Sequence, residues 1–389
     1  MLKQLKQEFH TLFKSENQVR TFFAPGRVNL IGEHTDYNGG HVFPCALSVG
    51  TYAIARLRSD KRVRMFSKNF PELGVIDFEI GDIHFEKEHD WANYPKGVMK
   101  EFQKHSHELL QGCEVLFYGN IPNGAGLSSS ASIELVTAVM INNLYSIKME
   151  MIDLVKISQY AENDFVGVSC GIMDQFAIGM GKKEHAILLN SETLAFTYSP
   201  VKLTDASLVI TNSNKRRGLA DSKYNERRYE CEQALNDLKK QLDIQTLSEL
   251  SASEFENFKG LIRDDVHRKR ARHVVYENQR TKEAVRKLKE NDVNGFGELM
   301  NESHHSLRDD YEVTGVELDV LVETAWDQDG VLGSRMTGAG FGGCTISIVR
   351  NNQLTHFKEK VYDTYLKETG LEADFYDVNI GDGARELVE

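Results

Sequence analysis

Residues 121–132 combine glycines with consecutive serines directly before a helical pattern. They read IPNGAGLSSSAS and follow the strand-like run at 113–118. Glycine lets a backbone approach a ligand closely, and the first N–H groups of a following helix can bind an anion. The arrangement predicts a phosphate cradle in which a serine hydroxyl can also ligate a metal ion. A serine-capped helix after an ordinary glycine turn fits the same residues.

A carboxylate lies on the next helical pattern, at residues 151–163. Val155, Ser158 and Glu162 recur at i, i+3 and i+7, so they share one face of that helix. A carboxylate among apolar side chains needs a proton, a cation or a metal ion as compensation. Mg²⁺ shared with a loop serine suits this position, because Mg²⁺ uses one or two carboxylates together with phosphates. A surface position at the helix end fits the same periodicity.

A third stretch, residues 25–40, reads PGRVNLIGEHTDYNGG and is dense in hydrogen-bonding side chains. A sugar offers adjacent hydroxyls, so fixed Glu, His and Asp side chains can distinguish epimers by leaving polar groups unpaired with the wrong one. Arg27 in this stretch can pair with a carboxylate or stabilise phosphoryl charge. A solvated, turn-rich loop is the alternative, because Gly, Asn and Asp favour turns.

The hydrophobic pattern predicts the elements that must hold these stretches. Short apolar or alternating runs indicate strands at 42–45, 50–57, 63–66, 75–80, 113–118, 186–190, 207–211 and 344–349. Helical periodicity covers 131–145, 151–163, 222–241, 264–290 and 354–368. Strands gather in the first half and long charged helices in the second, which favours an α+β fold. At this length we expect two domains, residues 1–200 and 201–389.

Charge restricts the classes of ligand that the protein can bind. The 58 acidic and 46 basic residues give a formal charge of -12, which argues against non-specific binding to nucleic acid or an anionic membrane. No lysine follows the phosphate loop in the GxxxxGK[ST] spacing. A bound nucleotide must therefore be neutralised by backbone amides, a helix terminus, a metal ion or a single placed arginine.

The cysteines and the N-terminal residues indicate the compartment. The five cysteines are odd in number and widely spaced, with no CxxC pair, which predicts free thiols in a reducing environment. Charges interrupt every apolar stretch of residues 1–17, which predicts an amphipathic helix and not a signal peptide. No run reaches the roughly 18 apolar residues of a membrane span. We expect a cytoplasmic protein, and a monomer.

Together with two further stretches, these motifs resemble the galactokinases of the GHMP kinase superfamily. GRVNLIGEHTDYNGG fits the galactokinase signature, and PNGAGLSSSAS fits the phosphate loop of the superfamily. CGIMDQF, at 170–176, is similar to the segment with the catalytic aspartate, and RMTGAGFGGC, at 335–344, to the third motif. The resemblance implies a bilobal fold, with a mixed-sheet N-terminal domain, a ferredoxin-like C-terminal domain and the active site between them.

The resemblance also implies ATP and Mg²⁺ as cofactors and galactose as the substrate. Asp174 would accept the proton of the anomeric hydroxyl, and Arg27 would stabilise the moving phosphoryl group. The positions implied for galactose are Glu33, His34, Thr35, Asp36, Gly171, Asp174 and Tyr224. Those implied for the nucleotide are Ser67, Trp91, Tyr94, Gly124, Ala125, Gly126, Leu127, Ser128, Ser129 and Ser130. Ser130 and Glu162 would hold Mg²⁺.

Other interpretations remain open for some of these residues and for the activity. Packing alone also explains Trp91 and Tyr94, and the glycines of residues 338–343 fit a tight turn before a strand. An N-acetylgalactosamine kinase and a non-catalytic galactose sensor have related motifs. The intact SSSAS loop disfavours the sensor, and EHTDYNGG disfavours a kinase for mevalonate or homoserine. We expect a galactokinase that makes galactose 1-phosphate for galactose catabolism.

Overall fold

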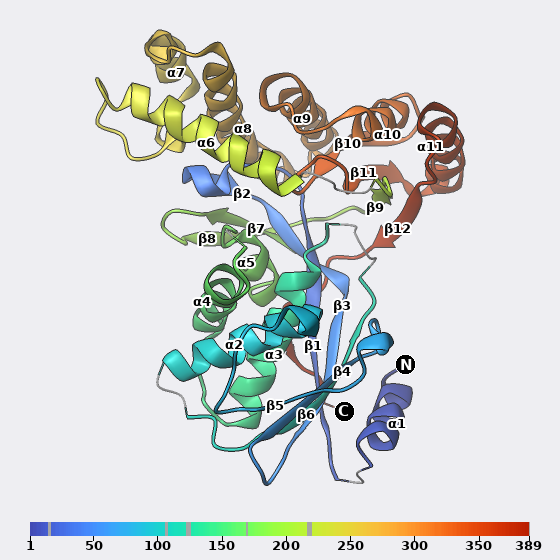
Figure 1. Ribbon diagram of the computed structural model, residues 1–389. Coiled ribbons are helices and arrows are strands. Elements are labelled where there is room, and N and C mark those ends of the chain that lie inside the picture. Colours follow the sequence, from blue (N-terminus) through green and yellow to red (C-terminus); the bar gives the residue numbers. More distant parts are fainter. Residues whose placement is uncertain (15–16, 106–107, 122–125, 169, 216–219, 389) are drawn as a thin grey trace.

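The protein has two regions, each built on a β-sheet covered by helices (Figure 1). The computed structural model describes residues 1–14, 17–105, 108–121, 126–168, 170–215 and 220–388. Within these residues no helix is both long and apolar enough to cross a lipid bilayer. The α+β class predicted from the sequence is confirmed.

A six-stranded mixed sheet forms the lower region of Figure 1. Its order is β13-β1-β3-β6-β4-β5, and every neighbouring pair is antiparallel except β4 with β6. The strands are β1 (Arg20–Asn29), β3 (Pro44–Leu57), β4 (Arg62–Ser67), β5 (Ile76–Glu79), β6 (Cys113–Gly119) and β13 (Arg385–Glu386). A separate three-stranded sheet contains β2 (His41–Val42), β7 (His185–Asn190) and β8 (Phe196–Pro200).

Helices cover both faces of the six-stranded sheet. Successive side chains of a strand point to opposite faces, and apolar side chains lie on both faces of this sheet. Ala53 and Ala55 of β3 face the larger core, whereas Ile54 between them packs in the cluster of α1 (Leu2–Phe13). The predicted amphipathic N-terminal helix is thereby confirmed. On the larger core lie α2 (Asn93–Lys104), α3 (Ser129–Leu144), α4 (Met151–Tyr160) and α5 (Met173–Gly179). α4 continues into a π-helical turn, η4 (Ala161–Val166).

The upper region is built on an antiparallel sheet with the order β10-β11-β9-β12. Its strands are β9 (Ala206–Asn212), β10 (Val331–Thr337), β11 (Cys344–Arg350) and β12 (Asp374–Val378). Helices follow β9 and β11, which gives the β-α-β-β-α-β connectivity of a ferredoxin-like domain. The helices are α6 (Ala220–Leu238), α7 (Ala252–Phe258), α8 (Asp265–Lys289), α9 (Val293–Ser306), α10 (Val316–Trp326) and α11 (Leu354–Thr369).

Short 3-10 or π turns join these elements. They are η1 (Asp36–Asn38), η2 (Pro71–Leu73), η3 (Lys87–Ala92), η5 (Leu247–Glu249), η6 (Lys259–Leu261), η7 (Leu307–Tyr311) and η8 (Asn351–Gln353). We propose that the two regions are the two domains expected from the sequence. The first then also includes β13, because β13 pairs with β1.

The prediction of two strands within residues 42–57 was wrong. Residues 42–45 and 50–57 were predicted as separate strands, but Pro44–Leu57 is one continuous strand. The stretch 25–40 is not wholly a loop, because its first residues complete β1. The register of β1 against β3 shifts between Pro25 and Arg27, as in a β-bulge. Gly26 lies at this shift, and a Cβ there would be only 2.8 Å from the carbonyl oxygen of Leu127.

Candidate active site

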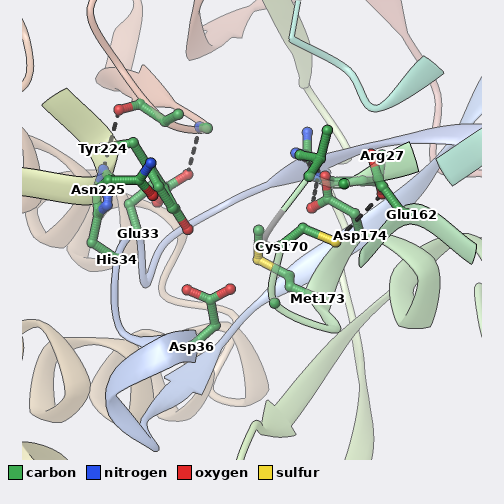
Figure 2. A pocket seen from close by; sticks show the side chains of 15 residues that line it. Arg27, Glu33, His34, Asp36, Glu162, Cys170, Met173, Asp174, Tyr224 and Asn225 are labelled. Carbon is green, nitrogen blue, oxygen red and sulfur yellow. Dashed lines mark hydrogen bonds and ion pairs between the residues drawn. The ribbon is translucent and has the colours of Figure 1, made fainter. Parts of the chain in front are cut away.

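A pocket of about 380 Å³ contains seven of the side chains that the sequence analysis assigned to a site, namely Arg27, Glu33, His34, Asp36, Glu162, Asp174 and Tyr224. Figure 2 shows Arg27, Asp174 and Glu162 on one side of it, and Glu33, His34 and Tyr224 on the other. The contributing elements are β1, η4, α5, α6 and the segment after β10, so both sheet regions supply its walls. The full lining is Arg27, Glu33, His34, Asp36, Glu162, Gly167, Val168, Cys170, Gly171, Met173, Asp174, Tyr224, Asn225, Gly338 and Ala339.

Arg27 and Asp174, 147 residues apart in the chain, form a two-point ion pair. Arg27 Nε lies 2.7 Å from Asp174 Oδ1, and Nη2 lies 2.7 Å from Oδ2. Arg27 Nη1 donates to the carbonyl oxygen of Gly126 at 2.8 Å. Bonds to the described residues use three of the five guanidinium N–H groups, and two have no partner among those residues. One arginine therefore joins the aspartate to the phosphate loop.

The described part of the phosphate loop leads directly into α3. Ser128, at the N-cap of α3, has a left-handed backbone (φ 60°), and its hydroxyl donates to Asp174 Oδ2. Ser132 in the first turn bonds Ala24 O at 2.9 Å and Thr51 Oγ1 at 2.8 Å, which fixes the start of α3 on the sheet. The predicted positions Gly124 and Ala125 lie outside the described residues. The cap residue of α3 thus contacts Asp174, and the first N–H groups of α3 have no partner within the helix itself.

Glu162 faces inward, as the helical spacing predicts, with 6 % of its surface exposed. Burial raises the pKa of this carboxyl, while hydrogen bonds from Ser130 and others lower it. Gln175 Nε2 donates to Glu162 Oε2 at 2.6 Å and to Glu134 Oε2 at 3.1 Å. Glu134 is fully buried, its pKa is raised well above the usual value by burial, and its Oε1 has no hydrogen-bond partner among the described residues.

Glu33 is held by donors from the end of β10 and the segment after it. Its Oε1 accepts from Gly338 N at 3.0 Å, its Oε2 contacts the guanidinium of Arg335, and its surface is 2 % exposed. Burial raises the pKa of Glu33, and the charge of Arg335 opposes that shift.

The His34 imidazole is neutral, because burial lowers its pKa to about 3. Its Nε2 lies 3.2 Å from Ala339 O, so this nitrogen donates, and Nδ1 accepts from the Tyr37 hydroxyl at 2.8 Å. The ring also packs on Tyr224 with a centroid separation of 5.6 Å. Both ring nitrogens thus have protein partners, so a ligand hydroxyl must share or displace one of them.

Asp36 and Gly171 touch at the floor of the pocket. A Cβ at Gly171 would lie 2.3 Å from Asp36 Oδ2. The Gly171→Ala variant should therefore push the Asp36 carboxylate aside without a backbone penalty, because Gly171 does not have a positive φ. We expect the KM for the sugar that the resemblance implies to rise about tenfold with little change in unfolding free energy.

The matched control is Gly81→Ala, because a Cβ there meets no atom within 4 Å. Steady-state kinetics and urea unfolding of both variants provide the measurement. Equal KM values for Gly171→Ala and Gly81→Ala would refute the positional role of Gly171.

Asp36 should make stability depend on pH. Burial, together with the charge of Asp174, raises its pKa from 3.8 to about 6. The folded protein keeps this proton up to about pH 6, whereas the unfolded chain releases it near pH 3.8, so stability falls as the pH rises between these values. Asp36→Asn removes the titration and should gain up to about 3 kcal/mol over the wild type between pH 4 and pH 7.

Urea unfolding at several pH values measures this difference. Asp164→Asn, on the exposed face of η4, serves as the control that should track the wild type throughout. A free-energy difference between Asp36→Asn and wild type that does not change from pH 4 to pH 7 would contradict the assignment.

Nine predicted residues that the structure describes lie outside the pocket lining: Thr35, Ser67, Trp91, Tyr94, Gly126, Leu127, Ser128, Ser129 and Ser130. Thr35 is fully buried, and its hydroxyl bonds Gly32 O and His41 O. Ser67 is 4 % exposed and accepts from Asn69 N at 3.2 Å. Trp91 is 5 % exposed and packs on Phe117 with ring centroids 5.6 Å apart. Burial and the nearby charge of Glu162 raise the pKa of Tyr94 to about 12. Their roles in ligand binding stay predictions.

Leu127 and Ser129 also belong to the predicted nucleotide set. Leu127 is buried and accepts a backbone hydrogen bond from Arg27 N at 3.1 Å, whereas Ser129 is exposed at the first residue of α3. Neither lines the pocket.

Sequence reasoning missed several residues of this site. Gln175 donates hydrogen bonds to both Glu162 and Glu134. Three further missed residues line the pocket: Cys170, Met173 and Asn225. Cys170 is a weak nucleophile, because burial and Glu162 raise the pKa of its thiol. Gln175 could have been identified from the sequence, because it directly follows Asp174 at the start of a short helix. No feature of the sequence indicates Asn225 as a site residue.

Family models match three parts of the chain. They are described as the galactokinase galactose-binding signature (residues 7–57), the GHMP kinases N terminal domain (93–182) and the GHMP kinases C terminal (284–366). A mevalonate kinase of Methanococcus jannaschii shares the fold, with a TM-score of 0.67 at 17 % identity over 95 % of this chain and all of that one. The fold and the site therefore define a GHMP-type kinase.

Full-length relatives narrow this class. The galactokinase of Clostridium beijerinckii is 57 % identical over 98 % of both chains, and that of Bacillus subtilis is 56 % identical over 100 % of this chain and 99 % of its own. The crystal structure of Lactococcus lactis galactokinase complexed with galactose matches with a TM-score of 0.97 and 48 % identity, over 99 % of this chain and 100 % of that one. The chain belongs to the galactokinase family.

Proposed function

We propose that this protein transfers the terminal phosphoryl group of ATP to the anomeric hydroxyl of galactose. The observation that carries the proposal is the Arg27–Asp174 pair, which lies between the start of α3 and a pocket lined by Glu33, His34 and Asp36. Phosphoryl transfer requires alignment and charge neutralisation more than covalent help, since its transition state is loose. The pair supplies both functions at one point.

In this proposal the phosphates lie at the N-terminus of α3, where unpaired backbone N–H groups face them. The two N–H groups of Arg27 without a protein partner bind the oxygens of the transferred group. Asp174 accepts a hydrogen bond from the attacking hydroxyl. Three donors, two from Arg27 and one from Ser128, fix the orientation of that carboxylate. The hydroxyl proton leaves late, after the bond to the leaving phosphate has lengthened.

Glu162 and Ser130 are the residues that we propose hold Mg²⁺. The donor set fits the ion, because a buried carboxylate and a serine hydroxyl hydrogen-bond each other next to the phosphate loop. Among the described residues no three His, Cys, Asp or Glu side chains form a ready-made metal cage, in line with an ion that completes its shell with phosphates and water. Bound there, Mg²⁺ neutralises phosphate charge. Gln175 holds the Glu162 carboxylate toward that position.

Glu33, Asp36, Gly171 and Tyr224 are proposed to contact the sugar, since all line the pocket. His34 contributes a rigid wall more than a new hydrogen bond, because both its nitrogens have partners. We further propose that the protein is a cytoplasmic monomer. The five cysteines form no disulfide, in agreement with a reducing compartment.

The test is ADP formation by the purified protein with MgATP and each of galactose, glucose, N-acetylgalactosamine and mevalonate. We expect the highest kcat/KM with galactose. Faster turnover of N-acetylgalactosamine would reassign the substrate, and galactose binding without ADP release would indicate a sensor. Light scattering after size-exclusion chromatography tests the monomer.

A further inference from the structure

The segment at the end of β10 and just beyond it, residues 335–339, reaches from the upper sheet region to the sugar side of the pocket. Arg335 and Thr337 are the last polar residues of β10, and Gly338 and Ala339 line the pocket. Nothing in the phosphoryl-transfer step uses this segment. Its contacts are instead with the residues of the N-terminal sugar stretch.

Three groups of this segment converge on the carboxylate of Glu33. Gly338 N donates to Oε1 at 3.0 Å, and Arg335 forms an ion pair with Oε2. The hydroxyl of Thr337 has one proton, which it shares between Asn29 O at 2.9 Å and Glu33 Oε1 at 3.2 Å. Arg335 is fully buried and Thr337 is 2 % exposed. Water therefore cannot substitute for these partners.

Contacts of Arg335 with residues other than Glu33 fix the position of its side chain. Its Nε donates to Ser303 Oγ at 3.2 Å, and Ser303 Oγ donates to Glu277 Oε1 at 2.6 Å. Glu277 also accepts from Gly32 N at 3.0 Å, directly before Glu33, and pairs with Arg280. Two buried carboxylates thus face two guanidinium groups, so the buried charges balance.

The same segment fixes the neighbouring histidine. Ala339 O is the acceptor for His34 Nε2, and His34 has a left-handed backbone with φ 64°. A strained residue keeps its conformation only where its surroundings hold it. Glu33 and His34 are therefore each held by a residue more than 300 positions later in the chain.

We propose that Arg335 and Thr337 are positioning residues that orient Glu33 toward one sugar hydroxyl, so that this segment determines which hydroxyl pattern the pocket accepts. The proposal rests on the galactose kinase activity proposed above. If Glu33 is held in one rotamer, the hydroxyl that it contacts contributes fully to binding. If Glu33 can leave that rotamer, the hydroxyl that it contacts contributes less binding free energy, whereas the contributions of the other hydroxyls stay the same.

The experiment uses the full chain and four variants: Arg335→Lys, Thr337→Val, Glu33→Gln and Ser334→Ala. Arg335→Lys keeps the positive charge but removes the planar guanidinium group. Ser334 is the matched control, because it is buried on the same strand but its hydroxyl bonds Ser347 at 2.8 Å. kcat and KM are measured for ATP, galactose and each monodeoxygalactose that keeps the anomeric hydroxyl. Melting temperatures report on folding.

We expect the galactose KM to rise about tenfold in Arg335→Lys and about threefold in Thr337→Val, with the ATP KM and kcat within about twofold of wild type. The deoxy sugar that Glu33→Gln tolerates best identifies the hydroxyl bound by Glu33. The penalty for omitting that hydroxyl should shrink in both variants and stay unchanged in Ser334→Ala. If Arg335→Lys does not fold, Thr337→Val alone decides.

The proposal would be overturned by a galactose KM in Thr337→Val equal to that of Ser334→Ala, or by deoxy-sugar penalties that change equally at every position. Failure of the underlying activity looks different, because wild-type protein would then release no ADP with galactose. A rise in both the galactose and the ATP KM would also count against it, since that indicates a general structural effect.

Discussion

The Asp174→Ala variant is expected to lose about 10³-fold in kcat, while its KM for ATP changes by less than about threefold. Asp174 is held by the Arg27 fork and by the Ser128 hydroxyl, and it lines the pocket. Its removal takes away the proposed acceptor for the attacking hydroxyl, whereas the N–H groups at the start of α3, which we propose bind the nucleotide, stay in place. The loss therefore concerns the transition state more than binding.

Asp174→Asn separates two roles of the carboxylate. An amide oxygen still accepts a hydrogen bond but takes up no proton, so a largely orienting carboxylate leaves Asn well above Ala in kcat. Single-turnover kinetics with MgATP and galactose isolate the chemical step. Asp164→Asn is the control. Wild-type turnover in Asp174→Ala would remove Asp174 from the mechanism.

The Arg27→Lys variant is expected to lose about 10² to 10³-fold in kcat despite its retained charge. A lysine ammonium is a point charge and cannot bond both oxygens of Asp174 and the Gly126 carbonyl in the plane that Arg27 uses. The aspartate and the phosphate loop would then lose their shared partner. Both the position of the acceptor and the charge on the transferred group are affected.

Arg20→Lys is a matched control on the same strand. Arg20 also makes a fork, to Glu386, with Nε 2.6 Å from Oε1 and Nη2 2.5 Å from Oε2, but it lies away from the pocket. Melting temperature and kcat are compared for the two variants. We expect similar changes in melting temperature and a large difference in kcat. Equal kcat values would show that the Arg27 fork is structural only.

Local patterns in the sequence predicted those parts of the site that depend on local structure. The spacing of Val155, Ser158 and Glu162 predicted either an inward carboxylate or a surface position at the helix end, and Glu162 is buried. Residues at i, i+3 and i+7 span two turns and share one helix face whatever packs on it. The glycine-serine stretch before α3 correctly placed the loop between a strand and a helix. Each inference used residues within about a dozen positions of one another.

Long-range pairs needed the resemblance or the structure. Nothing in the local pattern indicates that Arg27 meets Asp174, because their contact depends on the bulge in β1 and on the position of α5. The Arg335–Glu33 contact joins two sheet regions and was missed altogether. The sequence also could not indicate what the His34 ring binds. Its two nitrogens bond to protein groups that lie three and 305 residues away in the chain.

The edge of β1 is completed late in the chain. Phe22 and Phe23 pair with Glu386 and Arg385, and the Arg20–Glu386 ion pair spans 366 residues. During translation, β1 therefore emerges with one side of its backbone unpaired and stays so until residue 386 leaves the ribosome. An uncovered strand edge invites pairing with other chains. Assembly of the strand that carries Arg27 thus waits until residues 385 and 386 have been synthesised, and a nascent chain interrupted before residue 385 would present a site for aggregation.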